Sequence, residues 1–208
     1  MKLIKKTMNK EIIFIISAPS GTGKTTICKE LVKLVSNLKM SISYTTRQPR
    51  QGEKNGIDYY FVDRETFQSM LKNNEFIEWA EVYGNLYGTS KKVIEDLLQS
   101  GVDILMDIDT QGAKNIKERF NNSVLIFLIP PSLNELKRRL IQRGEQEETI
   151  KYRLMKALEE ISMYEIYDYV VENREIEETL RKIICIINAE RLKISRNREK
   201  IEKLRREY

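Results

Sequence analysis

The sequence predicts an α/β fold in which a parallel, doubly wound sheet presents a ligand site at the carboxyl ends of its strands. Four apolar runs, at 12–16, 102–108, 124–129 and 169–171, are typical of buried parallel strands. Helical patterns separate these runs, and this alternation favours a parallel sheet with helices on both faces. A glycine-rich turn at 18–25 joins the first strand to the first helix, as in phosphate-binding loops.

The helices are predicted from apolar residues spaced three and four positions apart. Ser132 and Glu135 form a capping box that starts one of these helices. A long helical pattern starts at Ile176 and becomes basic and polar beyond Arg191. The other predicted helices lie at 27–38, at 93–98 with a stop at Gly101, and at 132–140 with a stop at Gly144.

Residues 41–90 interrupt the alternation of strand and helix. The segment contains the only tryptophan, Trp79, and several tyrosines, and it is better explained by an inserted, mixed α/β substrate domain than by more core. Its predicted elements are a strand at 41–46, a turn-rich loop at 49–56, a strand at 59–62, a short helix at 64–71 and a hairpin at 76–87 around Gly84-Asn85.

The turn at 18–25 has the composition of a nucleotide-phosphate site. Its sequence is Ala18-Pro19-Ser20-Gly21-Thr22-Gly23-Lys24-Thr25, followed by Thr26. The two glycines let backbone N–H groups approach a phosphate, Lys24 supplies a positive charge to the β- and γ-phosphates, and the Thr25 hydroxyl can hold Mg²⁺. The start of the next helix adds its positive dipole end. Ala18 stands where the general pattern has glycine.

Composition excludes several other classes of protein. The 208 residues have a net charge of +5, and no apolar run approaches the ~20 residues that span a bilayer. The chain contains no histidine, which excludes histidine bases and Ser-His-Asp triads. Cys28 and Cys185 are interpreted as reduced core residues of a cytoplasmic protein. Residues 1–9 are expected to form a loose tail, and Met8 is an alternative start.

The insert carries candidates for binding a second, phosphorylated substrate. Arg47 and Arg50 flank a proline-stiffened turn and suit a terminal phosphate, to which Tyr59 and Tyr87 can donate hydrogen bonds. Glu78 can accept from the two adjacent donors of guanine, whereas adenine presents an acceptor there. Each residue taken alone also fits an ordinary surface or core-edge role. The hydroxyls of Ser43 and Thr89 are candidates to complete base recognition.

The chain resembles the guanylate kinase family from end to end. The matching segments are 17–25, 44–62, 75–80, 87–89 and 107–112. The resemblance implies ATP-dependent phosphorylation of GMP or dGMP. It assigns Arg47, Arg50, Tyr59 and Tyr87 to the GMP phosphate, and Ser43, Glu78 and Thr89 to guanine. It also implies a core at 1–42, 91–134 and 159–208, a GMP-binding insert at 43–90 and a small helical lid at 135–158.

Asp107 and Asp109 fall where the family has acidic residues between the two nucleotides. Both end an apolar strand, where a carboxylate can orient Mg²⁺ or its waters, and their spacing directs both side chains to one face. The alternative for Asp109 is a cap on the next helix. Arg139, Arg143 and Arg153 resemble the arginines of the family's lid, with solvated helix positions as the alternative. Asn173 matches a family position beside adenine.

Two other functions compete with a kinase. A non-catalytic, guanylate-kinase-like binding module would lose phosphate-loop and lid residues, yet Lys24, Thr25, Arg139 and Arg143 are all present. A nucleic-acid binder would use the basic C-terminal helix, but there the basic residues alternate with Glu199 and Glu202, which suits a solvated helix better. We therefore expect ATP and GMP or dGMP as the partners, with Mg²⁺, no nucleic acid and no membrane, in a monomer or homodimer.

Overall fold

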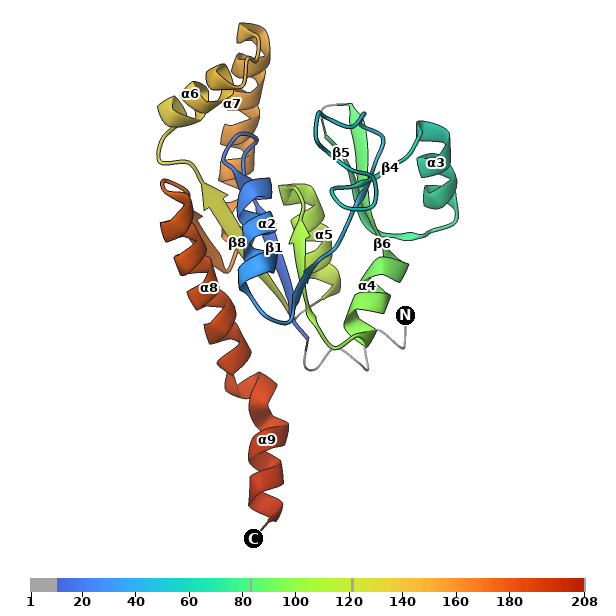
Figure 1. Ribbon diagram of the computed structural model, residues 1–208, viewed down its shortest axis with the longest axis vertical. Coiled ribbons are helices and arrows are strands. Elements are labelled where there is room, and N and C mark those ends of the chain that lie inside the picture. The colour runs from blue at the N-terminus through green and yellow to red at the C-terminus, as the bar shows by residue number, and fades with distance from the viewer. Residues whose placement is uncertain (1–10, 83, 121, 208) are drawn as a thin grey trace.

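The computed structural model describes residues 11–82, 84–120 and 122–207. The expectations of a loose tail at 1–9 and an alternative start at Met8 fall outside the described residues. Within the described ranges, no helix is long and apolar enough to cross a bilayer. Figure 1 shows a central sheet with its helices, a second sheet to one side, a helical hairpin above and a C-terminal helix that extends away from the sheet.

The central sheet has five parallel strands in the order β2-β7-β1-β8-β9, which confirms the predicted doubly wound α/β class. The strands are β1 (Ile13–Ser17), β2 (Leu38–Met40), β7 (Asp103–Asp107), β8 (Ser123–Ile129) and β9 (Tyr169–Glu172). β2 replaces the end of the helix predicted at 27–38. That helix, α2 (Lys24–Leu34), ends earlier because its C-cap residue, Val35, is extended, with φ −103° and ψ 116°, and Asn37 then adopts a positive φ of 57° before β2.

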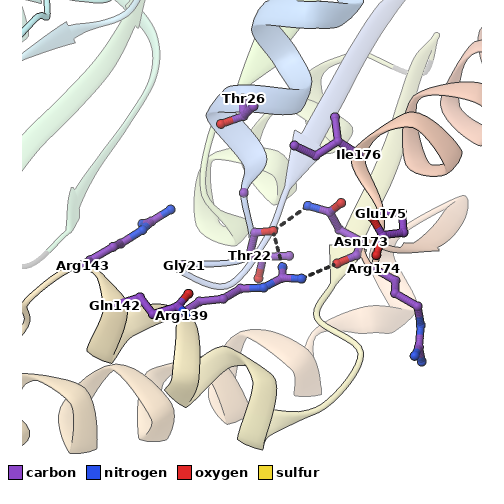
Figure 2. A pocket seen from close by; sticks show the side chains of 11 residues that line it. Gly21, Thr22, Thr26, Arg139, Gln142, Arg143, Asn173, Arg174, Glu175 and Ile176 are labelled. Atoms are coloured by element: carbon purple, nitrogen blue, oxygen red, sulfur yellow. Dashed lines mark hydrogen bonds between the residues drawn. The ribbon is translucent and has the colours of Figure 1, made fainter.

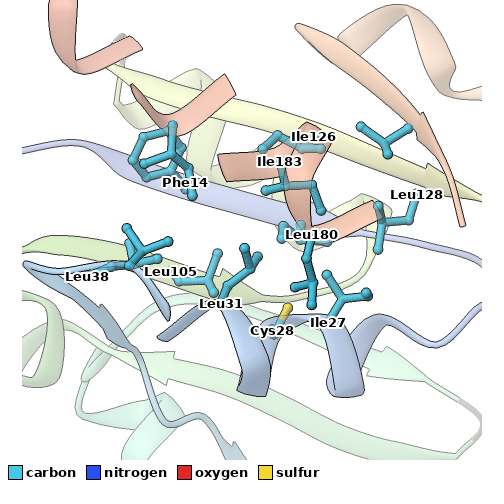
Figure 3. Close-up of a cluster of buried hydrophobic side chains, with 14 of the residues drawn as sticks. Phe14, Ile27, Cys28, Leu31, Leu38, Leu105, Ile126, Leu128, Leu180 and Ile183 are labelled. Carbon is cyan, nitrogen blue, oxygen red and sulfur yellow. The ribbon is translucent and has the colours of Figure 1, made fainter. Parts of the chain in front are cut away.

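Alternate residues of β1 enter two cores on opposite faces of the sheet. Phe14 and Ile16 pack with α2 and with α8 (Ile176–Leu192), as Figure 3 shows in part. Ile13 and Ile15 pack with α4 (Lys91–Gln99) and α5 (Thr110–Arg119). This two-residue alternation between buried faces explains why the strand is apolar throughout. The same burial fixes the loop after β1 at the carboxyl edge of the sheet.

The insert forms its own four-stranded sheet in the order β4-β3-β6-β5. Its elements are β3 (Tyr44–Thr45), β4 (Tyr60–Phe61), α3 (Arg64–Lys72), β5 (Phe76–Val82) and β6 (Asn85–Ser90). The predicted helix and hairpin are present, but β3 and β4 are shorter than the strands predicted at 41–46 and 59–62. Phe67, Phe76 and Leu86 form a small separate core beneath this sheet.

Two helices follow β8 and form the hairpin above the sheet, α6 (Leu133–Gln142) and α7 (Glu147–Ser162). The Ser132 hydroxyl accepts a hydrogen bond from Glu135 N, as the capping prediction requires. The Glu135 carboxylate, however, binds Arg138 and Arg139. α7 is continuous to Ser162, so the lid boundary expected at 158 falls inside a helix.

Two sequence expectations for the C-terminal region were wrong. The single long helix expected from Ile176 is divided at Lys193 into α8 and α9 (Ile194–Arg206). A short 3₁₀ turn, η1 (Tyr164–Ile166), lies earlier in the chain, before β9. Cys28 is buried as expected, but Cys185 is exposed. Ile183 and Ile187 face the core one turn apart, and Cys185 lies midway between them on the opposite side of α8.

Candidate active site

The phosphate-binding loop lies between the buried β1 and the start of α2. Gly21 and Gly23 have φ values of 97° and 101°, in the left-handed region that favours glycine. Thr22 N donates to Pro19 O at 3.0 Å, which closes the turn. A Cβ atom on Gly23 would lie 2.8 Å from Asn173 Nδ2, so glycine is required here by both conformation and space. The loop therefore directs the N-terminal end of α2 toward the sheet edge.

Lys24, the first residue of α2, bridges to the end of β7. Its Nζ atom lies 2.8 Å from Asp107 Oδ1 and donates to Ile108 O at 2.8 Å. Burial lowers the pKa of Lys24 and the Asp107 carboxylate raises it, with a net upward shift. Lys24 thus carries a permanent positive charge beside the phosphate loop.

Thr25 and Asp107 place two hard oxygen ligands for a metal ion together at the carboxyl edge of the central sheet. Thr25 Oγ1 donates to Asp107 Oδ2 at 3.0 Å. Mg²⁺ is held in kinases by one or two such protein oxygens together with substrate phosphates and water. No group of three or more metal-binding side chains is present in the part of the chain that the structure describes. The Thr25–Asp107 pair fits a magnesium ion that receives its other ligands from a nucleotide and water.

Three predicted base-reading residues of the insert come together. Thr89 Oγ1 donates to Glu78 Oε1 at 2.6 Å, and Ser43 Oγ lies 3.0 Å from Thr89 Oγ1. Glu78 is only 5% exposed. Burial and, to a lesser degree, the nearby Asp109 raise the pKa of Glu78 against the lowering effect of its Thr89 hydrogen bonds, and the net pKa is about 7. A buried carboxylate held by one hydroxyl retains acceptor capacity for a ligand.

Asp109 caps α5, as the alternative interpretation of this residue proposed. Its Oδ1 atom accepts from Gly112 N at 2.7 Å. The Asp109 carboxylate also lies near that of Glu78. A Cβ atom built on Gly112 would be 2.8 Å from Glu78 Oε2 and 3.2 Å from Asp109 Oδ1, so the two carboxylates approach the same point. Glycine at 112 therefore makes room for the Glu78 carboxylate.

Three of the four residues predicted to hold the second substrate's phosphate, Arg47, Tyr59 and Tyr87, lie together. Arg47 Nη2 lies 2.9 Å from both Glu53 oxygens, and its guanidinium lies over Tyr59, 5.5 Å from the ring centroid. Tyr59 and Tyr87 contact edge to face, with ring centroids 6.0 Å apart. Burial raises the pKa of Tyr59, which keeps its phenol a hydrogen-bond donor. Arg50 is exposed; its backbone N–H donates to Glu53.

The three lid arginines occupy different environments. Arg139 donates to Glu135, to Thr22 O at 3.2 Å and to Asn173 O at 3.1 Å. Arg153 Nη1 donates to Ser20 Oγ at 2.6 Å, and its Nε lies 2.8 Å from Glu145. Arg143 caps the end of α6 and is exposed. In Figure 2 the Arg143 side chain extends into open space, while that of Arg139 lies against the loop.

Arg139 and Arg143, but not Arg153, line an open pocket of about 370 Å³ between the phosphate loop, α6 and the β9–α8 turn (Figure 2). Asn173, the predicted adenine contact, is buried at its wall, and its Nδ2 atom donates to Thr22 O at 2.6 Å. The full lining is Gly21, Thr22, Gly23, Thr26, Arg139, Gln142, Arg143, Asn173, Arg174, Glu175 and Ile176.

Sequence reasoning missed several residues that hold this site together. Glu53 orients Arg47 and could have been found from its place six residues after that arginine in the turn-rich loop. Arg119 on α5 donates to Ile77 O and so holds β5 next to Glu78. Lys29 on α2 pairs with Asp58 of the insert. No local pattern signals Arg119 or Lys29, because their partners lie far away in the sequence.

The chain is similar to known proteins over most of its length. The family model described as guanylate kinase matches residues 10–190. A guanylate kinase of Rickettsia prowazekii is 49% identical over 90% of this chain and 96% of its own, and one of Nitrosomonas europaea is 50% identical over 88% and 92%. The crystal structure of guanylate kinase from Anaplasma phagocytophilum is 42% identical, with a TM-score of 0.77 and 90% of each chain covered. The chain belongs to the guanylate kinase family.

Proposed function

We propose that the two halves of the site divide the substrates, with ATP bound by the phosphate loop and GMP by the insert. The reaction is that of the family, transfer of the γ-phosphoryl group of ATP to GMP. An oxygen of the GMP phosphate attacks the γ-phosphorus, and the bond from that phosphorus to the β-phosphate oxygen breaks, giving ADP and GDP. The acceptor oxygen is already anionic, so a chain without histidine can perform this transfer.

Residues 18–26 hold the ATP phosphates in this proposal. The loop N–H groups and the α2 N-terminus bind oxygens, and Lys24 places its charge at the β- and γ-phosphates. The pocket beside the loop has room for the base and ribose of ATP, with Asn173 at its wall. Thr25 and Asp107 would hold Mg²⁺, which would supply positive charge to the ATP phosphates.

The single observation that supports GMP as the acceptor is the buried hydrogen-bond network of Ser43, Thr89 and Glu78. In this proposal the Glu78 carboxylate accepts from the ring N–H and the exocyclic amine of guanine. Adenine offers an acceptor in place of the ring donor and would leave a buried carboxylate unpaired, which is costly. Asp107 and Asp109 line the region between the two nucleotides, with Asp109 acting mainly through α5 and Glu78.

The GMP phosphate is assigned to Arg47, Arg50, Tyr59 and Tyr87. Glu53 binds Arg47 Nη2 and the Gln48 carbonyl binds Nη1, and together they fix the plane of the guanidinium for a phosphate. Arg50 is free to turn toward the same group, because its side chain is exposed at the turn. Two arginines and two phenols form a clamp that suits a phosphate monoester.

Arg139, Arg143 and Arg153 complete the proposal as a cationic lid over the transferred phosphoryl group. Arg139 and Arg153 already contact the loop at Thr22 and Ser20. Arg143 reaches the phosphoryl group only when the insert and lid close over both nucleotides. Charge that meets the phosphoryl group at that stage stabilises the transition state more than the ground state.

An ADP-release assay with GMP, dGMP, AMP, UMP and dTMP as acceptors tests the proposal. We expect turnover with GMP and dGMP and little with the others. Turnover that is equal with AMP would contradict the role of Glu78. The proposal further places the protein in the cytoplasm as a monomer or homodimer without nucleic acid, and its size in solution tests the oligomeric part.

A further inference from the structure

The carbonyl of Thr22 is held from two directions. Asn173 Nδ2 donates to it at 2.6 Å and Arg139 Nη1 at 3.2 Å, as the dashed lines in Figure 2 show. A peptide group is planar, and in the trans form its C=O and N–H point in opposite directions. Fixing the Thr22 carbonyl toward Asn173 therefore fixes the Gly23 N–H away from Asn173. That side is the one the proposed function gives to the ATP phosphates.

The orientation of the Asn173 amide is determined by its partners. The Thr22 carbonyl can only accept, so the amide must present its nitrogen there. Its oxygen then faces α8, where Thr179 Oγ1 lies 3.0 Å from Asn173 Oδ1. Asn173 is only 4% exposed, and a reversed amide would set two oxygens against each other in a buried place. A donor opposite Oδ1 is what prevents that reversal.

Thr179 is the residue that supplies this donor. It lies in the first turns of α8, is 1% exposed, and its Oγ1 atom also lies 2.9 Å from Glu175 O and 3.4 Å from Glu172 O. Its single proton can serve one of the three acceptors well. Glu175 O already accepts from Thr179 N at 3.0 Å. The buried Asn173 Oδ1 is therefore the acceptor that depends most on the hydroxyl.

We propose that Thr179 is a positioning residue for ATP binding, which acts through the Asn173 amide on the Thr22–Gly23 peptide of the phosphate loop. Thr179 itself lies on α8, behind Asn173, and is not among the residues that line the pocket. Its effect is expected on affinity for the ATP phosphates and not on GMP, whose binding residues lie in the insert. This inference rests on the proposed division of the site between the two nucleotides.

Replacing Thr179 by valine tests the relay, because valine keeps the shape of the side chain and removes only the hydroxyl. We expect the Kd for a non-hydrolysable ATP analogue with Mg²⁺, measured by calorimetry, to rise about tenfold. We expect the Kd for GMP alone to stay within about twofold. Thr179→Ser keeps the hydroxyl and is the matched control, for which ATP affinity close to that of the native protein is expected.

A double-mutant cycle separates a relay from a general structural role. If Thr179 acts through Asn173, then Thr179→Val should cause no further loss of ATP affinity in an Asn173→Ala background. An additive loss, or an equal loss of ATP and GMP affinity, would overturn the proposal. Native ATP affinity in folded Thr179→Val would overturn it as well. If the valine variant does not fold, Thr179→Ala takes its place in the same cycle. Failure of the native protein to phosphorylate GMP would instead refute the proposed function.

Discussion

Glu78→Gln is expected to weaken GMP recognition while stabilising the protein at neutral and alkaline pH. The glutamine keeps the length of the side chain, and its amide oxygen can accept from Thr89 as Glu78 Oε1 does. The other carboxylate oxygen, Oε2, becomes an NH₂ group. That group faces guanine donors with a donor of its own, so one of the two proposed hydrogen bonds to the base is lost.

The loss on the recognition side follows from removing a charge-assisted, buried hydrogen bond. Such a change costs on the order of 2–4 kcal/mol in transition-state stabilisation, or roughly 30- to 1,000-fold in kcat/KM for GMP. AMP gains from the same change, because its ring acceptor meets a donor. The ratio of GMP to AMP activity is therefore expected to fall more than the GMP activity alone.

The gain on the stability side follows from the pKa of Glu78. Burial raises this pKa from 4.5 to about 7, so the folded protein binds the proton more tightly than the unfolded chain. The resulting stability is complete below about pH 4.5 and is lost as the pH rises through 7. At about 1.36 kcal/mol per pH unit, ionisation of Glu78 costs the folded protein about 3 kcal/mol above pH 7. Glutamine carries no charge and avoids this cost.

Thermal unfolding at pH 5 and pH 8, together with GMP binding at pH 6 and pH 8, measures both effects. At pH 8 we expect Glu78→Gln to have a higher Tm than the native protein. At pH 5 we expect the difference in Tm between the two proteins to be smaller. Between pH 8 and pH 6, the GMP affinity of the native protein should fall about tenfold more than that of the variant. At pH 6 only about a tenth of the Glu78 side chains are ionised. The GMP phosphate titrates near pH 6 in both proteins and cancels in this comparison. An unchanged GMP to AMP ratio, or a variant less stable at pH 8, would refute the reasoning.

Four further substitutions test other parts of the site. Lys24→Ala should abolish turnover and leave the Kd for GMP nearly unchanged by calorimetry, and a loss of GMP affinity in the folded variant would contradict the division of substrates. Arg143→Ala should lower kcat by roughly 10²–10³-fold with little change in Tm, because the Arg143 side chain is exposed. Arg139→Ala should lower both kcat and Tm, since Arg139 binds the backbone of Thr22 and Asn173. Gly112→Ala should reduce GMP affinity at least tenfold without affecting ATP affinity, since its Cβ would lie 2.8 Å from Glu78 Oε2; native GMP affinity would show that the carboxylate can move aside.

The sequence predicted the features that depend on local pattern and missed those that depend on distant partners. Strands β1, β7 and β8 of the central sheet were predictable because both of their faces are buried and their sequences are largely apolar, whereas the short β2, with Lys39 exposed, was missed. The division at Lys193 was not, because the residues on both sides of it favour helix. The insert strands β3 and β4 were predicted too long, since their pairing spans only two residues in register with each other.

The same distinction applies within the site. Glu78, Thr89 and Ser43 were selected by chemistry, and the structure brings them into contact. The cap formed by Asp109 was one of two stated alternatives, because a strand-end aspartate before a helix suits either role. Arg119 and Thr179 could not be selected, since an arginine late in a helix and a threonine early in one are ordinary residues until their partners, Ile77 and Asn173, are located.

The guanine side of the site is built from both sheets. Glu78 lies on β5 of the insert, and Thr89 of β6 binds one of its oxygens, but Asp109 and Gly112 beside the other oxygen belong to the loop and helix that follow β7 of the central sheet. Arg119 of the same helix holds the β5 backbone one residue before Glu78. The raised pKa of Glu78 therefore depends on how β5 lies against α5, and so does the shape of the space for the base. Under the proposed assignment of Glu78 to guanine, selectivity is consequently a property of the contact between insert and core. Transplanting residues 43–90 alone onto another phosphate-loop core is then not expected to carry it over.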